Sequence, residues 1–257
     1  MLGVGLGISS PVVLATAYPT EANEKSLVVD GTNDIARQGD GDNIFDDLNT
    51  GSWSLQFYIY FPTSAASKYM IWKGDSFTAY LTFYTDSSGD LNFRGQSDAS
   101  THTMTQVWDT SFAADTWYHI VITSDGSASD RVNKCYKDGS LVSATTTSTI
   151  ASSVALESPT GSAKLMIGTL LNLIFYNLNM DSIATWDAVL TAAEVAELSG
   201  NHPDLKEEAG DYSSKASLQR YYKMEEGTGT TVADSSGNGN AAIVLINGAT
   251  FSSEKPF

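Results

Sequence analysis

Residues 117–141 constrain the fold of this chain more than any other stretch. They begin with the β-branched and aromatic run Trp-Tyr-His-Ile-Val-Ile-Thr, whose alternate residues point to opposite faces of a strand, with both faces largely covered. After a polar loop, a second extended run ends in Asp138-Gly139. This dipeptide is typical of a type I′ hairpin turn, because glycine reaches positive φ freely. The centre of the chain is therefore predicted to be antiparallel sheet.

Further strands and one helix are predicted on either side of this centre. Residues 53–61 alternate strictly between apolar and mostly polar positions, which predicts a long strand with one apolar face. Shorter strands are predicted at 69–72, 78–84 and 91–94. Thr191 and Glu194 form a capping box that opens one short helix near 191–199, which Gly200 is predicted to end.

Composition limits the number of domains and the partners. The chain has 257 residues, of which 42% are hydrophobic, and this is enough for one all-β domain with a sizeable core. Thirty acidic against fourteen basic residues give a formal charge of −16, which repels phosphate backbones and anionic lipid. Nucleic acid and membranes are therefore not expected as partners. The single cysteine, Cys135, excludes an internal disulfide and is interpreted as a small core residue.

Residues 1–24 are predicted to form an N-terminal docking arm that contacts other subunits of a homo-oligomeric or multicopy assembly. The segment lacks the basic residues of a signal peptide, and it is too short and interrupted to span a bilayer. An N-terminal strand of the domain itself is an open alternative. The apolar residues that would dock are Leu2, Val4, Leu6, Ile8, Val12, Val13 and Leu14.

Several blocks in order resemble laminin-G-like domains of the concanavalin A-like lectin and glucanase superfamily. They are S-L-V-V-D-G at 26–31, G-S-W-S-L at 51–55, W-Y-H-I-V-I-T-S-D-G at 117–126, Y-K-D-G-S-L-V at 136–142, K-L-M-I-G at 164–168, and D-S-I-A-T-W at 181–186 with the helix. The resemblance implies a two-sheet antiparallel jelly-roll sandwich, here expected as a single domain over 25–257.

One block of the resemblance is out of place. Residues 218–240 end in Y-Y-K-M-E-E-G-T-G-T-T-V-A-D-S-S-G-N-G-N, which in such domains often precedes the S-L-x-F-D-G block but here follows the helix. Residues 216–250 are therefore expected to supply the strand that usually opens the domain. The strand at 220–224 is predicted to pair near the strand that ends at Trp186, with pairing to a neighbouring subunit as the alternative.

Catalytic patterns are missing. Glucanases of this superfamily carry an E-x-D-x-x-E strand whose paired carboxylates serve as nucleophile and acid, whereas Glu225 and Glu226 are adjacent and are predicted to point to opposite faces of a strand. Gly74-Asp75-Ser76 resembles the Gly-Asp-Ser block of an esterase family, but no histidine follows in Asp-x-x-His spacing, so a turn is predicted there. His119 is expected to be a packed, hydrogen-bonded residue. The chain is therefore predicted not to be an enzyme.

Four carboxylates crowd one loop: Asp40, Asp42, Asp46 and Asp47. Laminin-G-like domains often hold calcium through loop carboxylates, and hard oxygen ligands close in sequence suit Ca²⁺. A solvated acidic loop is the alternative in so acidic a chain.

The function expected from the sequence is that of a non-enzymatic, lectin-like structural or adhesive protein. The chain resembles in style the virion surface proteins of bacteriophages, which are capsid decorations, fibres or appendages, with the N-terminal arm as the attachment and cell-surface glycan as a candidate ligand. The alternative is a secreted, extracellular, calcium-dependent carbohydrate-binding domain, and a degenerate glycosidase comes last.

Overall fold

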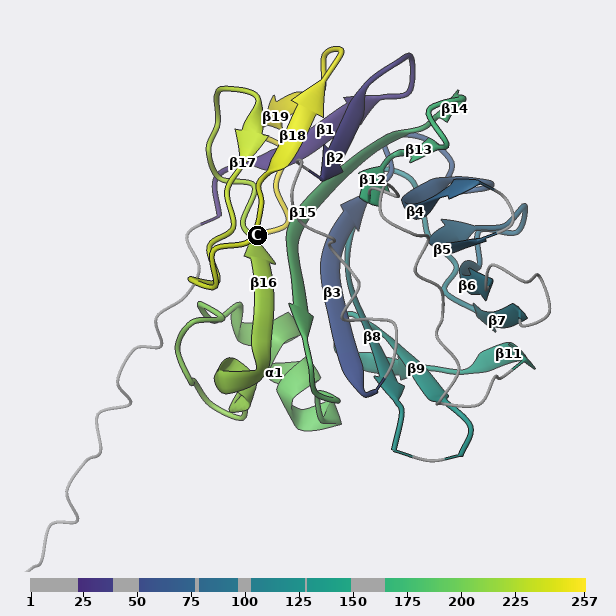
Figure 1. Cartoon of the computed structure of the whole chain (residues 1–257), viewed down its shortest axis with the longest axis vertical. Coiled ribbons are helices and arrows are strands. Elements are labelled where there is room, and N and C mark those ends of the chain that lie inside the picture. The colour runs from purple at the N-terminus through teal and green to yellow at the C-terminus, as the bar shows by residue number, and fades with distance from the viewer. Residues whose placement is uncertain (1–22, 39–50, 77–78, 97–102, 128, 149–164) are drawn as a thin grey trace, which may run out of the picture.

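The protein is an all-β sandwich of two large antiparallel sheets with one short α-helix, as Figure 1 shows. The computed structural model describes residues 23–38, 51–76, 79–96, 103–127, 129–148 and 165–257, and every structural statement below concerns these residues. The predicted fold class is confirmed.

The first sheet has eight strands in the described part of the chain, in the order β10-β9-β8-β3-β15-β1-β19, with β16 paired to β15. Its strands are β1 (Ser26–Asp30), β3 (Trp53–Tyr60), β8 (Trp117–Asp125), β9 (Val132–Lys137), β10 (Ser140–Val142), β15 (Asn177–Trp186), β16 (Leu218–Tyr222) and β19 (Thr250–Ser252).

The second sheet has nine described strands in the order β11-β7-β6-β5-β4-β12-β2-β18-β17. They are β2 (Ile35–Gln38), β4 (Tyr69–Ser76), β5 (Ala79–Thr85), β6 (Leu91–Gln96), β7 (Thr103–Trp108), β11 (Ala144–Ser148), β12 (Leu165–Ile167), β17 (Thr231–Val232) and β18 (Ile243–Ile246). A small hairpin of β13 (Thr169–Leu170) and β14 (Ile174–Phe175) leads from this sheet toward β15.

The main core lies between the two sheets. The alternating residues that begin at Trp53 and end at Phe61 are fully buried, as their pattern predicted. Trp53 meets Phe93 of β6 edge to face at 5.7 Å, and Phe93 stacks on Phe83 of β5 at 4.6 Å. Such aromatic pairs add about 0.5–1.5 kcal/mol to the burial of their area, so the rings fix the two sheets against each other.

A second cluster covers the other face of the eight-stranded sheet. Helix α1 (Ala192–Asn201) packs Val195 and Leu198 against Val121 of β8 and Trp186 of β15. The predicted capping box is confirmed, because the Thr191 hydroxyl accepts from the Glu194 amide and the Glu194 carboxylate accepts from the Thr191 amide. β8 is consequently buried on both faces, as predicted.

The predicted end of the helix is wrong by two residues. The helix runs through Gly200 to Asn201 and ends at His202, which takes the left-handed conformation with φ 45°. In the predicted hairpin turn between β9 and β10, Asp138 and Gly139 have φ of 50° and 78°. The hairpin turn at Asp138-Gly139 is therefore confirmed.

The C-terminal block completes the eight-stranded sheet. β16 pairs antiparallel with β15, with Tyr222 opposite Ile183 and Leu218 opposite Trp186, so the predicted pairing is confirmed. The D-S-S-G-N-G-N motif holds this strand in place. The Asp234 carboxylate accepts from the backbone amides of Tyr221, Ser236 and Asn240, while the Asn240 side-chain amide donates to the carbonyl of Gln219.

Two local predictions are wrong. Gly74 is not the start of a turn, because β4 continues to Ser76 and Gly74 pairs with Tyr80 of β5. Glu225 and Glu226 lie beyond the end of β16 rather than on a strand. Glu225 accepts from the amides of Glu24 and Lys25, and Glu226 accepts from the amide of Ala233, so both carboxylates bind backbone.

Candidate functional site

Two groups of residues singled out in the sequence lie outside the described residues. They are the acidic loop Asp40, Asp42, Asp46 and Asp47, and the apolar docking residues Leu2, Val4, Leu6, Ile8, Val12, Val13 and Leu14. In the described ranges, no three side chains of His, Cys, Asp or Glu gather so that they could hold a metal ion. No helix in those ranges is long and apolar enough to cross a membrane. In the first described range, the Asn23 side-chain amide donates to the buried Asp181 at 2.5 Å.

The titratable residues of the eight-stranded sheet have structural roles. His119 is 3% exposed, stacks on Tyr58 at 4.5 Å and places Nε2 3.3 Å from the Gln56 side-chain oxygen. Burial lowers its pKa to about 3, with a smaller contribution from His202, so the ring is neutral at neutral pH. Cys135 is fully buried, and burial raises the pKa of its thiol, which removes the reactive thiolate. Both are packed residues, as predicted.

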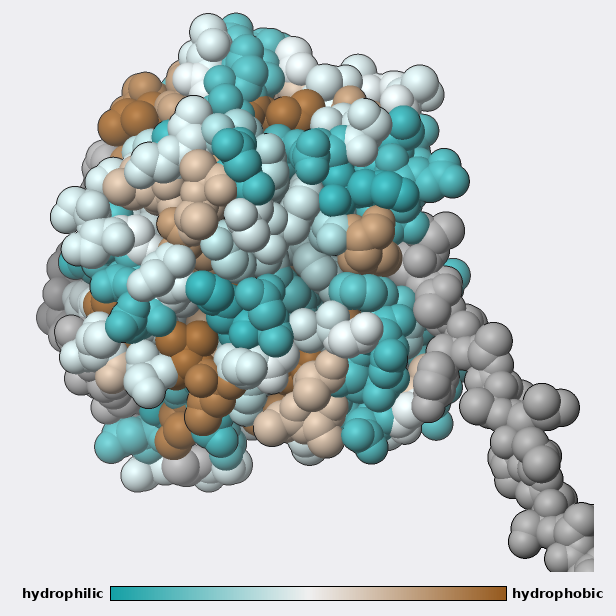
Figure 2. All heavy atoms as spheres, turned by 180° about the vertical axis from the view of Figure 1, so that it is seen from behind, coloured by the Kyte–Doolittle hydropathy of each residue, from teal (hydrophilic) through white to brown (hydrophobic). Residues whose placement is uncertain are grey.

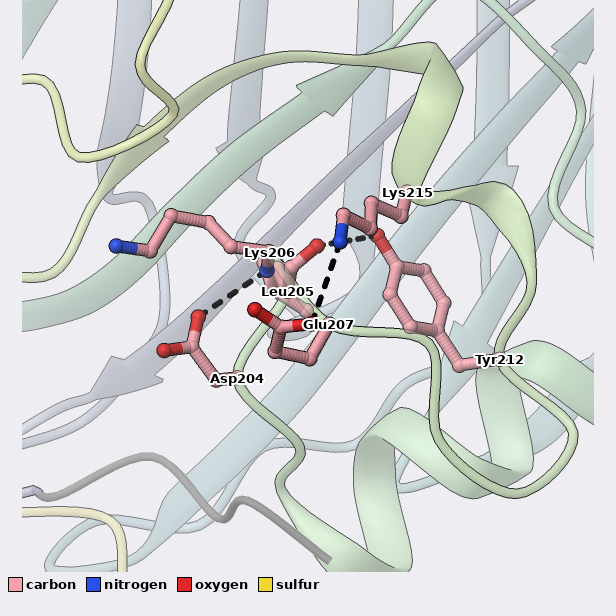
Figure 3. Close-up of polar contacts among 6 residues, drawn as sticks. All are labelled: Asp204, Leu205, Lys206, Glu207, Tyr212 and Lys215. Carbon is pink, nitrogen blue, oxygen red and sulfur yellow. Dashed lines mark hydrogen bonds and ion pairs between the residues drawn. The ribbon is translucent and has the colours of Figure 1, made fainter.

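A shallow hollow of about 420 Å³ lies beside the loop that follows α1, and Figure 3 shows part of it. Its lining includes Glu207, Glu208 and Lys215. Lys215 pairs with Glu207 at 3.2 Å, and the nearby Tyr212 hydroxyl donates to the Leu205 carbonyl at 2.9 Å. These polar groups already bind one another, and none of the described residues that line the hollow is aromatic. The hollow is therefore a poor candidate for a ligand site.

The candidate site lies on the outer face of the nine-stranded sheet. The register across β4, β5 and β6 places Ile71, Phe83 and Phe93 toward the core, so the residues that alternate with them face outward. A register shift between Tyr69 and Ile71 adds Tyr69 to this outer face, where it pairs with Tyr84. There, aromatic rings and one guanidinium gather on adjacent strands and beside the β13–β14 hairpin. We call this surface the tyrosine–arginine face, and its members are Tyr69, Trp72, Tyr80, Tyr84, Arg94 and Tyr176.

The rings of this face contact one another through two stacked pairs and two tilted contacts. Tyr69 lies at its centre, 4.9 Å from Tyr84 with the planes 13° apart and 5.8 Å from Tyr176. Trp72 stacks on Tyr80 at 4.6 Å, and the Arg94 guanidinium lies 5.6 Å from the Tyr80 ring centre. Trp72 is 1% exposed and Tyr80 6%, so these two form a buried floor. Tyr69, Tyr84, Tyr176 and Arg94 are partly exposed and form the rim.

The phenolic hydroxyls of this face have no hydrogen-bond partner. Those of Tyr69, Tyr80, Tyr84 and Tyr176 make no hydrogen bond in the part of the chain that the structure describes. The hydroxyls of Tyr58, Tyr118, Tyr212 and Tyr222, by comparison, have partners within the protein. None of the four hydroxyls of the tyrosine–arginine face is among the buried polar atoms, so each reaches solvent and is available to an external ligand.

The electrostatics of the face keep these hydroxyls neutral. Desolvation raises the pKa of all four tyrosines, and the charge of Arg94 opposes this only in part for Tyr69, Tyr80 and Tyr84. Neutral phenols both donate and accept hydrogen bonds. The face therefore offers ring surface, hydroxyls of both polarities and one cation, which suits a polar, polyhydroxylated ligand.

The sequence contains only a weak signal of this face. Tyr80 and Tyr84 share one side of the predicted strand 78–84, opposite Leu81 and Phe83, which marks that side as aromatic. Arg94 lies on the next strand, where it pairs with Thr82, but Tyr176 comes from a distant part of the chain, and only the tertiary structure brings it to the same face.

Large exposed apolar side chains are few in the described ranges: Val132, Leu141, Leu173, Ile174 and Val189. On the side that Figure 2 presents, the brown hydrophobic areas are separate patches among hydrophilic surface. No broad apolar surface competes there with the tyrosine–arginine face as a recognition site.

The fold and the site thus define a two-sheet antiparallel sandwich domain with an aromatic, polar outer face. A family model described as the concanavalin A-like lectin/glucanases superfamily matches residues 30–196. The chain therefore belongs to this superfamily, and the resemblance in its sequence blocks is confirmed. No curated protein matches the sequence.

Solved structures share the fold at low sequence identity. A candidate carbohydrate-binding protein from Bacteroides ovatus matches with a TM-score of 0.57 and 14% identity over 91% of this chain. This chain spans 60% of the length of that protein. The IT-sialidase CBM40 of Ruminococcus gnavus bound to α2,3-sialyllactose matches with a TM-score of 0.51 and 11% identity, over 70% of this chain and 100% of that one. At these identities the likeness extends to the fold alone.

Proposed function

We propose that this chain is a non-enzymatic, lectin-like adhesive module that binds glycan through the tyrosine–arginine face. The observation that carries the proposal is the set of unpaired phenolic hydroxyls around a stacked aromatic floor. Glycans present many hydroxyls together with apolar C–H faces, and sites with a few convergent polar groups among aromatic rings complement both. The carbohydrate-binding context of two structures with the same fold is consistent with this assignment.

The experiment compares glycan binding by the whole chain and by two single-hydroxyl variants. The chain is screened on a glycan array, and the best ligand is titrated by calorimetry. Tyr84→Phe removes only an unpaired hydroxyl and is expected to weaken binding about five- to tenfold, the effect of one lost hydrogen bond of about 1 kcal/mol. Tyr60→Phe is the control on the eight-stranded sheet. It removes a hydroxyl that donates to Asp115 at 3.2 Å, away from the tyrosine–arginine face, and it should leave the affinity for glycan unchanged. Absence of binding to any glycan would refute the proposal.

The module is proposed to act on a virion surface, as a capsid decoration, fibre or appendage present in several copies. The basis is the sequence of residues 1–24, whose apolar side chains would contribute about 1.5–3 kcal/mol each when buried against a neighbouring subunit. Deleting residues 2–20 should leave the melting profile of the isolated domain nearly unchanged. The same deletion should convert a multicopy assembly, weighed by native mass spectrometry, into monomers. If the deletion unfolds the domain, the segment is a strand of the sandwich and not an arm.

The alternative setting is a secreted, calcium-dependent carbohydrate-binding domain. It predicts that a chelator abolishes glycan binding and that an Asp42→Asn change does the same. Binding through the tyrosine–arginine face alone predicts that neither treatment alters the affinity, so the same titration separates the two.

A further inference from the structure

A second arginine lies in register with the tyrosine–arginine face. Neighbouring strands place Arg94, Thr82, Trp72, Met166 and Arg37 opposite one another in one row across β6, β5, β4, β12 and β2, on the side of the sheet away from the main core. The three middle residues of the row are buried, and the two arginines at its ends are partly exposed. Each arginine is therefore two strands away from Trp72. With a strand spacing of about 4.8 Å, each backbone position lies about 10 Å from that of Trp72 and the two arginine positions lie about 19 Å apart.

Neither arginine is paired in the part of the chain that the structure describes. The guanidinium of Arg94 contacts the ring of Tyr80 but makes no ion pair or hydrogen bond there, and Arg37 also makes none. The Nε atom of each is buried without a partner. By comparison, Lys223 pairs with Asp204 at 3.4 Å, and the Arg131 guanidinium donates to the Gly51 carbonyl at 3.0 Å.

Unpaired arginines are unexpected in so acidic a chain. Acidic residues outnumber basic ones by thirty to fourteen, so carboxylates were available to neutralise two surface guanidiniums. A third cation borders the same face, since Lys68 lies 6.0 Å from the ring centre of Tyr176. Among the described residues, three cations therefore lie on or beside this face of a molecule whose overall charge is −16.

We propose that the ligand of this face is an anionic glycan, an oligosaccharide whose carboxylate or sulfate groups pair with Arg94 and Arg37. The sugar units between these groups contact the tyrosine hydroxyls of the rim. This inference rests on the proposed function and narrows its ligand class. Guanidinium suits this role because its planar fork of donors matches carboxylate and sulfate oxygens in pairs, and because it keeps its charge at any physiological pH.

The spacing of the two arginines also predicts a length dependence. A single charged sugar can reach one guanidinium, whereas an oligosaccharide that carries several charged units can reach both. Affinity is therefore expected to rise with the number of charged units until the ligand spans the row, and to gain little beyond that length.

The test uses one polysaccharide in two charge states. Oligogalacturonates of increasing length and the same oligomers with their carboxyl groups methyl-esterified are titrated into the whole chain, with chondroitin sulfate as the sulfated arm. The variants are Arg94→Gln and Arg37→Gln, and Lys134→Gln is the control that removes the same charge from an exposed position on β9 of the other sheet. Circular dichroism and a melting curve verify that each variant is folded.

The expected result is binding of the charged oligomers that methyl esterification abolishes. Arg94→Gln and Arg37→Gln should each weaken it about ten- to a hundredfold, in keeping with the loss of a charge-assisted hydrogen bond. Lys134→Gln should have no effect. Arg94→Lys should restore part of the affinity because it keeps the charge but loses the fork.

Two results overturn the inference in distinguishable ways. If the methyl-esterified oligomers or other neutral glycans bind as tightly as the charged ones and the arginine variants are unaffected, the ligand is neutral and the proposed function stands. If neither charged nor neutral glycans bind, the proposed function fails as well.

Discussion

Replacing Asp234 with alanine should destabilise the protein strongly, because this carboxylate fixes the C-terminal loop to β16. It accepts five hydrogen bonds: from the amides of Tyr221, Ser236 and Asn240 at 3.1, 3.0 and 3.2 Å, from the Ser236 hydroxyl at 2.7 Å and from the Asn240 side-chain amide at 2.8 Å.

The size of the stability loss depends on which of the five donors can hydrogen-bond to water once the carboxylate is removed. Hydrogen bonds to a charged group contribute about 1.5–3 kcal/mol each, but the carboxylate is partly exposed, so water replaces it for the loop donors at little cost. The amide of Tyr221 lies in β16 on a residue that is fully buried. If the bond from the Tyr221 amide is lost in full and the four remaining bonds together contribute about half as much, Asp234→Ala should lower the free energy of unfolding by about 3 kcal/mol. For a domain of this size that corresponds to a melting temperature lower by about 6–12 °C.

The pH dependence provides a second, independent test. Burial alone would raise the pKa of Asp234, but the hydrogen bonds from Ser236, Tyr221 and Asn240 outweigh it and hold the pKa below its usual value. A carboxylate with a depressed pKa contributes stability that is fully present above its unfolded value, near 4, and is lost as the pH falls through the folded value. The difference between wild type and Asp234→Ala should therefore shrink below about pH 4.

The assay is urea unfolding at pH 7 and pH 3, followed by tryptophan fluorescence. Asp211→Ala, which removes an exposed carboxylate that receives no hydrogen bond in the described structure, is the matched control and should change stability by less than about 0.5 kcal/mol. A loss below about 1 kcal/mol for Asp234→Ala, or an equal loss at both pH values, would refute the reasoning.

Three further predictions concern packing, protonation and chemistry. Gly168→Ala should lower the free energy of unfolding by about 1–3 kcal/mol, because φ is 70° and a Cβ would lie 2.4 Å from a methyl group of the buried Val29. Gly229→Ala should lower it less, because φ is 93° but no atom lies within 4 Å of the added Cβ. Burial lowers the pKa of His119 to about 3, so the unfolded chain binds a proton at a higher pH than the folded protein does. The urea midpoint should therefore fall as the pH drops from 6.5 toward 3, and His119→Gln should make this pH dependence weaker. An unchanged pH dependence in the variant would contradict the buried neutral ring. Laminarin, xylan and ester substrates should not be turned over, and turnover abolished by a single acidic or serine substitution would show that the chain is an enzyme.

The sequence alone determined the regular elements whose signals are local. The period of two in residues 53–61, the Asp138-Gly139 turn and the capping box of Thr191 and Glu194 each depend on a few neighbouring residues, and each is found where it was predicted. The sequence blocks that occur in the order typical of laminin-G-like domains also indicated the superfamily, which the family match over residues 30–196 confirms. The errors arise where a local signal competes with tertiary context. Pairing with Tyr80 keeps Gly74 in β4, the helix continues through Gly200, and β16 ends before Glu225 and Glu226.

Only the tertiary structure decided which residues share a face. Ser54 and Gln56 alternate with core residues of β3 and would be read as solvent-facing, yet helix α1 and its loops cover that side of the sheet and both are buried. Conversely, nothing near Arg94 in the sequence points to Arg37, because they lie on strands separated by β5, β4 and β12. Alternation fixes the side of a strand on which a residue lies, but strand order, which depends on long-range pairing, fixes its neighbours and therefore the candidate site.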